Sequence, residues 1–342
     1  MAEWTALREL TDDVRQTITP CLEVLPHELA RSGGDPAGNL PHGVSRLAKR
    51  IRHNWGPRSI LVDASHLTPS LRPEMVALLA QAAPAYDITP IWTLSLNEAT
   101  PLYVSARQSA ANRILRLALR VDYSELDKDD ISDRIDLALR DLGVSPAETC
   151  FLVDYGVTDY VSPDYEWLAD HVPHMTTWKE FVVIGGSFLR DLDGLAVGTR
   201  FHPRWDWIHW ESWARVIRHT STRLPAFSDY TIQHAIFREP VQGSNPTASI
   251  RYAAGNYWVI VRGEALWNRR KQESRYDQYF GNARLLADRD EFKGAPYSFG
   301  DRYISEVVQQ RTGPGTPTTW LAAGMNHHMT LAARQTKEVA AV

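Results

Sequence analysis

Cysteine is scarce in this chain of 342 residues, in which only Cys21 and Cys150 occur. Each lies in or beside an apolar run, which favours two buried free thiols in a reducing compartment over a disulfide between them. Long apolar runs are also missing. None approaches the roughly 20 residues that cross a bilayer, and the start lacks a basic segment followed by an apolar leader. These absences predict a cytoplasmic protein that has no membrane partner.

The sequence motifs of several large enzyme classes are absent as well. There is no GxxxxGK[ST] loop and no GxGxxG fingerprint, which argues against a P-loop NTPase or a Rossmann dehydrogenase. GxSxG, HExxH and CxxC are missing, which argues against an α/β-hydrolase and against a zinc site. With 37 basic and 41 acidic side chains, the chain is not coated in positive charge, although a local basic groove stays open.

The chain does contain seven apolar runs at nearly regular intervals. They end at Glu23, Asp63, Leu94, Asp122, Asp154, Gly186 and Asp229, so successive ends lie 28 to 43 residues apart. One strand and one return helix of a (β/α)₈ barrel occupy about 30 residues, and such barrels carry their chemistry at the strand carboxyl ends. We therefore predict an α/β fold, a TIM-like (β/α)₈ barrel, with any site at that rim.

The start and the end of the chain depart from this pattern. An amphipathic helix over 4–18 opens the chain, so the barrel lacks its first strand, which either lies upstream or is replaced by another segment. SIRYAAGNYWVIVRG predicts a β-hairpin that turns at Gly255-Asn256. We expect a barrel over 1–239, an α+β extension over 240–333 that packs on it, and a loose tail over 334–342. Trp207, Trp210, Trp213 and Ile217 share one helix face and predict core packing.

Four carboxylates, Glu23, Asp63, Asp154 and Asp229, end predicted strands, so a barrel would bring them to one rim. Convergent carboxylates suit hard cations such as Mg²⁺ or Mn²⁺, and Asp154 and Asp229 are also candidate catalytic groups. The alternative is structural, because an Asp after a strand often caps the next helix. Arg120 faces the barrel interior. It either forms a salt bridge with Asp63 or Asp154 or clamps a phosphate or carboxylate ligand.

Further candidate ligand-binding residues lie later in the chain. Gly185, Gly186 and Ser187 follow a strand and either hold an anion on backbone N–H groups or form a tight turn. Tyr230, Arg251, Tyr252 and Arg262 either build a stacking platform with cations or pack across strands. Residues 262–275 hold five basic and two acidic side chains with Trp267, and they either guide nucleic acid or form a solvated surface.

His327 and His328 are adjacent, so they point apart on a helix or strand and cannot easily share a metal ion. One of them is a candidate acid or base, because the imidazole pKa lies near neutrality.

The order of short motifs resembles the family known as beta protein, found in bacteria and their phages without an established activity. The motifs are ITPCLEVLP, ILVD, FLVDYG, PAFSDY, SIRYA, WVIVRG, YSFGD and GMNHHM. Members begin with an extended YVPIL-type segment that this chain lacks, in agreement with the missing first strand. The resemblance implies an intracellular role in phage conflict and a protein partner from the same operon. It implies no catalytic residue.

Two functions follow as hypotheses. In the first, the barrel rim binds a phosphate-bearing ligand, a nucleotide or nucleic-acid end, and hydrolyses it with Mg²⁺ or Mn²⁺ in a phage-defence setting. In the second, the protein is a non-catalytic recognition or partner-binding subunit of a defence system, whose carboxylates only cap helices. A third and weaker hypothesis is an enzyme that acts on a small carboxylate or sugar.

Overall fold

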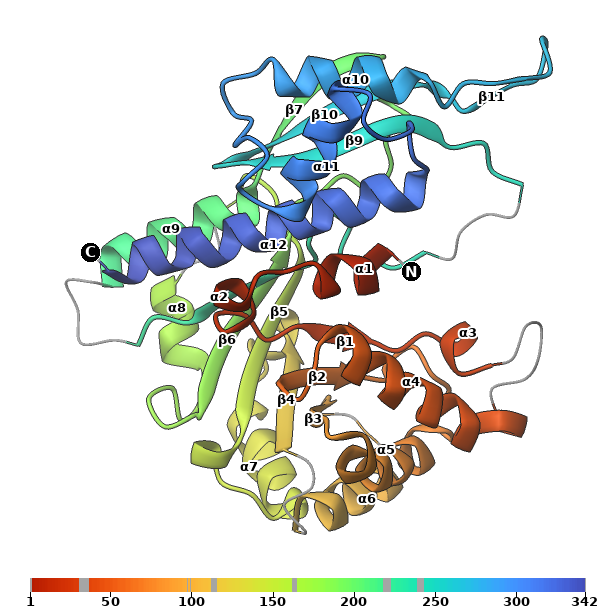
Figure 1. Cartoon of the computed structure of the whole chain (residues 1–342). Coiled ribbons are helices and arrows are strands. Elements are labelled where there is room, and N and C mark those ends of the chain that lie inside the picture. Colours follow the sequence, from red (N-terminus) through yellow and green to blue (C-terminus); the bar gives the residue numbers. More distant parts are fainter. Residues whose placement is uncertain are drawn as a thin grey trace.

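The computed structural model describes residues 2–30, 37–96, 98, 100–111, 116–161, 165–217, 223–238 and 243–341. It is a mixed α/β fold in which two sheets lie on either side of a long C-terminal helix (Figure 1). The larger sheet occupies the N-terminal two thirds of the chain. The smaller sheet belongs mainly to the C-terminal third.

The larger sheet has seven parallel strands in the order β1-β2-β3-β4-β5-β6-β8. These strands are β1 (Cys21–Glu23), β2 (Ser59–Asp63), β3 (Thr89–Leu94), β4 (Arg116–Asp122), β5 (Cys150–Val157), β6 (Glu180–Gly186) and β8 (Ala226–Asp229). All seven predicted runs are thus confirmed as strands. The sheet curls into a half-barrel, and within the described residues no ladder joins β1 to β8. The complete barrel is therefore not confirmed.

Helices between the strands cover the convex face of the half-barrel (Figure 1). Amphipathic α4 (Leu40–Asn54) buries Val44, Leu47 and Ile51. Helix α7 (Ile131–Leu142) is followed by Gly143 as its C-cap, whose φ of 68° suits glycine. The helices of this part are α3 (Pro26–Leu29), α4 (Leu40–Asn54), α5 (Arg72–Tyr86), α6 (Thr100–Ala111), α7 (Ile131–Leu142), α8 (Tyr165–His171) and α9 (Trp205–Ile217), with 3₁₀ turns at Ala37–Asn39, Tyr123–Glu125 and Pro146–Glu148.

The predicted opening helix is two helices, α1 (Ala2–Arg8) and α2 (Asp12–Arg15). Thr11 has extended backbone angles and begins the second helix as its N-cap residue, which is a habit of threonine. The prediction of one continuous helix over 4–18 was therefore wrong at 9–11, between the two helices, and at 16–18, after the second helix.

The smaller sheet is antiparallel, with the order β7-β10-β9. The predicted hairpin is confirmed: β9 (Thr247–Ala254) and β10 (Tyr257–Ala265) pair around Gly255, whose φ is 59°. β7 (Gly198–Pro203), from the segment expected in the barrel, pairs with β10. Helices α10 (Gln278–Ala287) and α11 (Phe299–Val308) pack on this sheet, and β11 (Trp267–Asn268) and β12 (Glu273–Ser274) form a separate small hairpin. The predicted domain boundary, between residues 239 and 240, lies outside the described residues.

Helix α12 (Pro317–Ala341) lies between the two sheets and contacts α1, α11 and β9. Ala333 joins the core beneath the larger sheet, and Val339 packs against it. The expectation of a loose tail over 334–342 is therefore corrected for residues 334–341, which continue the helix. Ala, Gln, Arg, Lys and Glu dominate that segment, and they favour a helix even without an apolar period.

The main core fills the space between the larger sheet and its helices, and it includes Trp207, Trp210, Trp213 and Ile217, as predicted. A smaller apolar cluster lies on the concave face. It contains Leu61, Ile91, Ala118, Cys150, Leu152 and Ile184. Cys150 is buried as expected, but Cys21 is exposed, because it lies on the edge strand β1. Across the described residues, every helix is too short or too polar to pass through a membrane.

Candidate functional site

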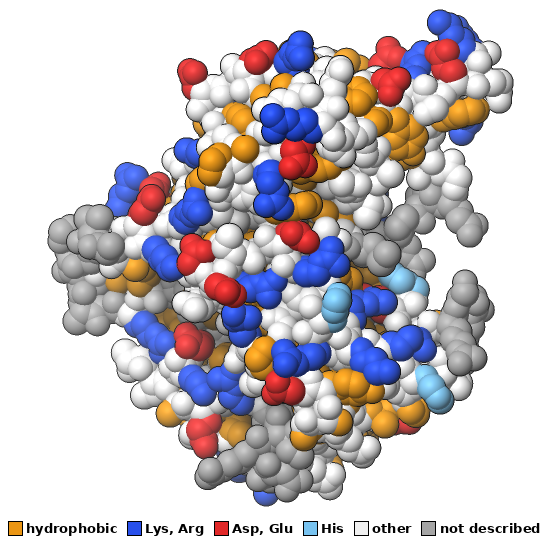
Figure 2. All heavy atoms as spheres, viewed as in Figure 1, with side chains coloured by type: hydrophobic (Ala, Val, Ile, Leu, Met, Phe, Trp, Pro, Cys, Tyr) orange, Lys and Arg blue, Asp and Glu red, His pale blue; other side chains and the backbone are white. Residues whose placement is uncertain are grey.

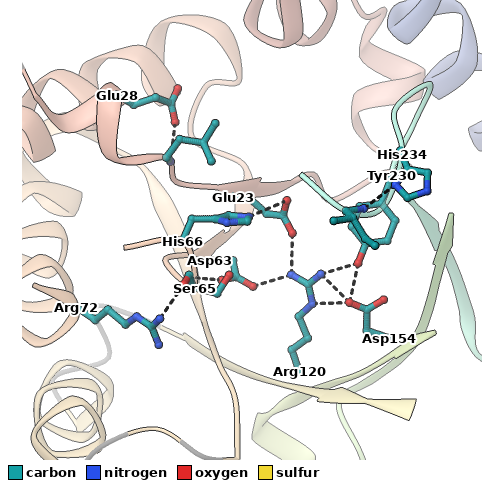
Figure 3. A network of polar contacts seen from close by, with 12 residues as sticks. Glu23, Glu28, Asp63, Ser65, His66, Arg72, Arg120, Asp154, Tyr230 and His234 are labelled. Carbon is teal, nitrogen blue, oxygen red and sulfur yellow. Dashed lines mark hydrogen bonds and ion pairs between the residues drawn. The ribbon is translucent and has the colours of Figure 1, made fainter. Parts of the chain in front are cut away.

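The Arg120 side chain is the hub of a polar cluster at the carboxyl end of the larger sheet (Figure 3). Its Nη1 donates to Glu23 Oε1 at 3.0 Å and to Asp63 Oδ2 at 2.7 Å. Its Nε and Nη2 donate to Asp154 Oδ2 at 3.0 and 2.7 Å. Nη2 also donates to the Tyr230 hydroxyl at 2.7 Å, and that hydroxyl donates to Asp154 Oδ2 at 2.6 Å. These five residues are named the Arg120 cluster.

Strand alternation directs Arg120 to the concave face. Leu119 and Val121 of β4 belong to the outer core, whereas Ala118 belongs to the interior cluster. Arg120 shares the orientation of Ala118 because side chains two residues apart lie on one face of a strand. The salt bridge that the sequence offered as one role for Arg120 is thus formed, with both Asp63 and Asp154.

The aspartates that end four of the predicted strands share one local geometry. In each, Oδ1 accepts a hydrogen bond from the backbone N–H two residues later, at 2.7 to 2.9 Å, which is an Asx turn. The pairs are Asp63 with Ser65, Asp122 with Ser124, Asp154 with Gly156, and Asp229 with Thr231. One carboxylate oxygen therefore fixes the turn. In Asp63 and Asp154 the other oxygen points to Arg120.

The Arg120 cluster carries excess negative charge and is open on one side. Three carboxylates face one guanidinium, which leaves an excess of two negative charges. Asp63 is nearly buried, but the Glu23 side chain is 29% exposed and lies 3.7 Å from His66 Nε2. The His66 ring meets the Phe237 ring edge-on at 5.2 Å. The open side is therefore acidic and lined by aromatic rings.

Protonation in the cluster follows from these neighbours. Burial raises the pKa of Tyr230, and nearby Asp154 adds to that effect, so the phenol keeps its proton and donates it to Asp154. Burial works against the charge on Arg120. The surrounding Tyr230, Asp154 and Asp63 outweigh burial and raise the pKa of Arg120. The cluster is thus a stable arrangement of one cation and three anions.

A second polar cluster lies deeper, between the two sheets. His328 Nε2 contacts Asp229 Oδ2 at 2.7 Å, and Arg204 Nη2 lies 4.0 Å from the same oxygen. Arg204 is fully buried, with its guanidinium 5.6 Å and 5.2 Å from the ring centres of Trp207 and Trp258. This burial lowers the pKa of Arg204. Burial opposes ionisation of Asp229, but His328 outweighs it and lowers the pKa of Asp229.

Asp206 belongs to the same buried region. Its Oδ1 accepts a hydrogen bond from Ser187 Oγ, and burial raises the pKa of Asp206. Its Oδ2 and Thr158 Oγ1 have no partner among the described protein atoms. Both residues line a cavity of about 20 Å³ next to Gly185. That space suits one water molecule, which would serve both oxygens.

The predicted anion site at Gly185, Gly186 and Ser187 is occupied by protein side chains. A Cβ on Gly185 would lie 2.8 Å from Thr158 Cγ2, and one on Gly186 would lie 2.8 Å from a Tyr230 ring carbon. Both glycines therefore make room for neighbouring side chains. Ser187 faces a carboxylate, which disfavours an anion at the same place.

Arg251, Tyr252 and Arg262 do not join Tyr230. The Arg251 guanidinium donates to the Ile232 carbonyl at 2.8 Å and lies over Phe188, and burial lowers its pKa to about 10. Tyr252 points the other way into the core of the smaller sheet. Arg262 pairs in register with Ser249 on β9. These residues therefore do not form a stacking platform with Tyr230. Their contacts are those of the alternative, packing within and across the strands.

His327 and His328 point apart on α12, as predicted. The His327 Nδ1 contacts Asp301 Oδ2 at 2.7 Å, and its Nε2 contacts the Ala253 carbonyl at 2.9 Å. Both histidines are buried. Their acid–base role stays a prediction, and their present contacts link α12 to one sheet each.

Metal binding was predicted at Glu23, Asp63, Asp154 and Asp229. Arg120 lies among the first three, and Asp229 belongs to the buried cluster with His328. In the described part of the chain, no group of three or more His, Cys, Asp or Glu side chains is placed to hold a metal ion. The Mg²⁺ or Mn²⁺ site stays a prediction, and no role below depends on it.

Three residues in or beside these clusters were not predicted from the sequence. His66 follows the Asx turn of Asp63, and Arg204 and Asp206 flank the start of α9. The sequence feature that could have indicated them is a polar residue shortly after a strand, as in the motifs DASH and HPRWDW. Neither motif indicates which side chain turns inward, because that depends on the loop backbone.

Two comparisons with known proteins bear on this chain. A family model described as Beta protein matches residues 1–334, nearly the whole length. No curated protein matches the chain.

Proposed function

We propose that this chain, which belongs to the Beta protein family, is a recognition protein whose Arg120 cluster binds a cationic group, an amine or a guanidinium. The proposal rests on one observation: three carboxylates surround one arginine whose five N–H donors are all used in hydrogen bonds within the cluster. The protein would hold its ligand without transforming it. This proposal shares a non-catalytic recognition role with the second function expected from the sequence, but it gives the carboxylates a ligand-binding role instead of helix capping.

Charge is the first support. An excess of two negative charges in a partly buried site attracts a cation and repels a phosphate, and burial strengthens both effects. The partly exposed Glu23 carboxylate is the natural first contact. Its Oε1 accepts from Arg120, while Oε2 lies 3.7 Å from His66, too far for a hydrogen bond.

The state of Arg120 is the second support. A guanidinium has five N–H donors, and five hydrogen bonds leave Arg120 for Glu23, Asp63, Asp154 and Tyr230. A phosphate could engage Arg120 only by replacing one of these bonds. The phosphate-bearing ligand and its hydrolysis therefore stay predictions, and the experiment below tests the ligand directly.

Aromatic rings beside the cluster are the third support. The Tyr230 ring centre lies 5.9 Å from the guanidinium carbon of Arg120, and the Phe237 ring meets the ring of His66 next to Glu23. Ring faces attract ammonium and guanidinium groups, most strongly where water is excluded. Carboxylates and rings together define a cation site.

The test is thermal unfolding with a panel of probes: putrescine, agmatine, inorganic phosphate, AMP, MgCl₂ and MnCl₂. Putrescine or agmatine at millimolar concentration should raise the melting temperature by about 2 °C or more. Glu23→Gln should abolish that rise, and Glu74→Gln, an exposed change on α5, should keep it. Stabilisation by phosphate or AMP with none by either amine would reject the cation site and favour the phosphate hypothesis.

We also propose that the half-barrel is a (β/α)₈-type barrel with one strand position, between β8 and β1, not filled by a strand. The sequential parallel order and the reach of Arg120 from β4 to Glu23 on β1 and to Tyr230 after β8 support this. The expected role in phage defence, with a partner from the same operon, rests on the resemblance alone and stays a prediction.

A further inference from the structure

A short hairpin extends from the smaller sheet, away from the body of the protein (Figure 1). Its strands β11 and β12 pair Trp267 with Ser274 and Asn268 with Glu273. Three consecutive basic residues, Arg269, Arg270 and Lys271, form its tip. All three are exposed.

The tip backbone is held by neutral side chains. Asn268 Oδ1 accepts from the backbone N–H groups of Arg270 and Lys271 at 3.1 and 3.3 Å. Gln272 Nε2 donates to the Arg269 carbonyl at 2.7 Å. The basic side chains take no part in these bonds, so the loop keeps its shape while they remain free to bind.

The base of the hairpin is fixed to the preceding chain. Asn245 Oδ1 accepts from the Trp267 N–H at 2.9 Å, and Asn245 Nδ2 donates to the Trp267 carbonyl at 2.7 Å. The hairpin is therefore a pre-formed projection, so little conformational entropy is lost when a ligand binds it.

Charge is distributed unevenly along the hairpin. Arg275 at its base forms ion pairs with Glu264 and, at 3.8 Å, with Glu273. In the described ranges, no ion pair reaches the three basic residues at the tip. Figure 2 shows basic side chains at the end of this projection. Three like charges side by side repel one another, and an anionic ligand relieves that repulsion.

Trp267 supplies a second kind of contact beside the cations. Its side chain is 43% exposed, which is unusual for so large an apolar group. Basic groups that track a backbone, together with an exposed aromatic ring on which bases stack, are the two elements of single-strand binding. An anionic lipid surface or an acidic protein would use the charges without needing the ring to stack.

We propose that the β11–β12 hairpin binds single-stranded nucleic acid, with Arg269, Arg270 and Lys271 on phosphates and Trp267 stacked on a base. This site is independent of the Arg120 cluster. The net charge of the whole protein is −4, so binding would be local to the projection.

The test is fluorescence anisotropy of the full chain with labelled 12-mer oligothymidylate and oligouridylate between 50 and 200 mM salt. Three phosphate contacts predict a slope of log K against log salt of about −2, or about a 20-fold weakening over that range. Replacing all three basic residues with Gln should flatten the slope nearly to zero. Trp267→Ala should weaken binding by about fivefold or more.

Matched controls separate this site from general charge effects. A variant with Arg284, Arg311 and Lys337 replaced by Gln loses three exposed positive charges outside the hairpin. Its affinity for the oligonucleotides should equal that of the wild type. Tyr160→Ala removes an exposed ring outside the hairpin and should also leave the affinity for the oligonucleotides unchanged. Glu23→Gln, which tests the cation site, should bind oligonucleotides as tightly as the wild type does. Failure of the cation site can therefore be distinguished from failure of the hairpin site.

Three results would overturn the proposal. One is equal affinity of the triple Gln variant and the wild type at 50 mM salt. Another is full affinity of Trp267→Ala. The third is tighter binding to vesicles of phosphatidylserine, or to polyglutamate, than to either oligonucleotide under the same conditions, since that would assign the hairpin to a membrane or a protein.

Discussion

The Arg120 guanidinium and the Tyr230 hydroxyl are joined by a 2.7 Å hydrogen bond across the concave face of the sheet. Arg120 lies on the central strand β4, whereas Tyr230 directly follows the edge strand β8. The same guanidinium reaches Glu23 on the opposite edge strand, β1. One side chain thus connects the middle of the half-barrel with both of its edges, and it can stabilise the curvature as well as the site.

Arg120→Met should destabilise the protein strongly, because it leaves three carboxylates facing each other with no cation. We expect a loss of about 3 kcal/mol in the free energy of unfolding, at the lower end for broken buried ion pairs because one side is open. Urea titration followed by circular dichroism measures it. Arg8→Met, which removes an exposed partner of Glu9, should change stability by less than about 0.5 kcal/mol. Equal effects of the two changes would contradict the role of Arg120 as the hub.

Gly186→Ala should displace Tyr230 from the Arg120 cluster. The new Cβ would lie 2.8 Å from a Tyr230 ring carbon and 3.1 Å from the Ala235 Cβ, so the ring must move. Such overpacking costs about 1 to 3 kcal/mol. Gly194→Ala is the matched control, because no atom lies within 4 Å of its added Cβ. Urea titration of both variants should show a loss for the first and none for the second. Unchanged stability of Gly186→Ala would mean that Tyr230 is not held against this glycine.

The strands of the larger sheet could be predicted from sequence because each is a short apolar run, and five of the seven runs end in a carboxylate. Asp63 ends β2 with an Asx turn, and that turn is local enough to be predicted from a few residues. Asp154 forms the same turn within β5, where the pairing with β6 is irregular before the strand ends at Val157. The hairpin of β9 and β10 was predictable for the same reason, since Gly255 marks its turn.

Strand β7 and the buried cluster could not be predicted in this way. β7, GTRFHP, has no alternation and is only partly buried, because it is the edge of its sheet. Arg204 is fully buried because residues far apart in the chain meet around it: the rings of Trp207 and Trp258, and Gln335 of α12. The exposure of Cys21 likewise depends on β1 having a ladder partner on only one side within the described residues, which the apolar sequence around Cys21 did not indicate.

The stability of the smaller sheet should depend on pH through Glu291. Hydrogen bonds from Arg289, at 2.9 Å, and from Tyr257, at 2.6 Å, lower the pKa of Glu291 from 4.5 to about 2. Since the folded pKa lies below the unfolded one, this stabilisation is complete above pH 4.5 and is lost as the pH falls through about 2. Glu291→Gln should therefore lose about 1 to 2 kcal/mol at pH 7 and converge with the wild type near pH 2.

Urea titrations at pH 7, 5 and 3 would measure that convergence, with Glu74→Gln as an exposed control that should follow the wild type at every pH. A gap that stayed constant from pH 7 to pH 3 would show that Glu291 contributes through packing instead of charge.

Thiol labelling should distinguish the two cysteines. Cys21 is exposed on the edge strand β1, Cys150 is buried, and both are free, so a neutral maleimide should label only Cys21 in the folded protein. Because the thiolate is the form that reacts, labelling of Cys21 should accelerate as the pH rises. Mass spectrometry should count one label on the folded protein, two after unfolding in guanidinium, and none on folded Cys21→Ser. Labelling of Cys150 in the folded variant would mean that the interior beneath the Arg120 cluster opens to solvent.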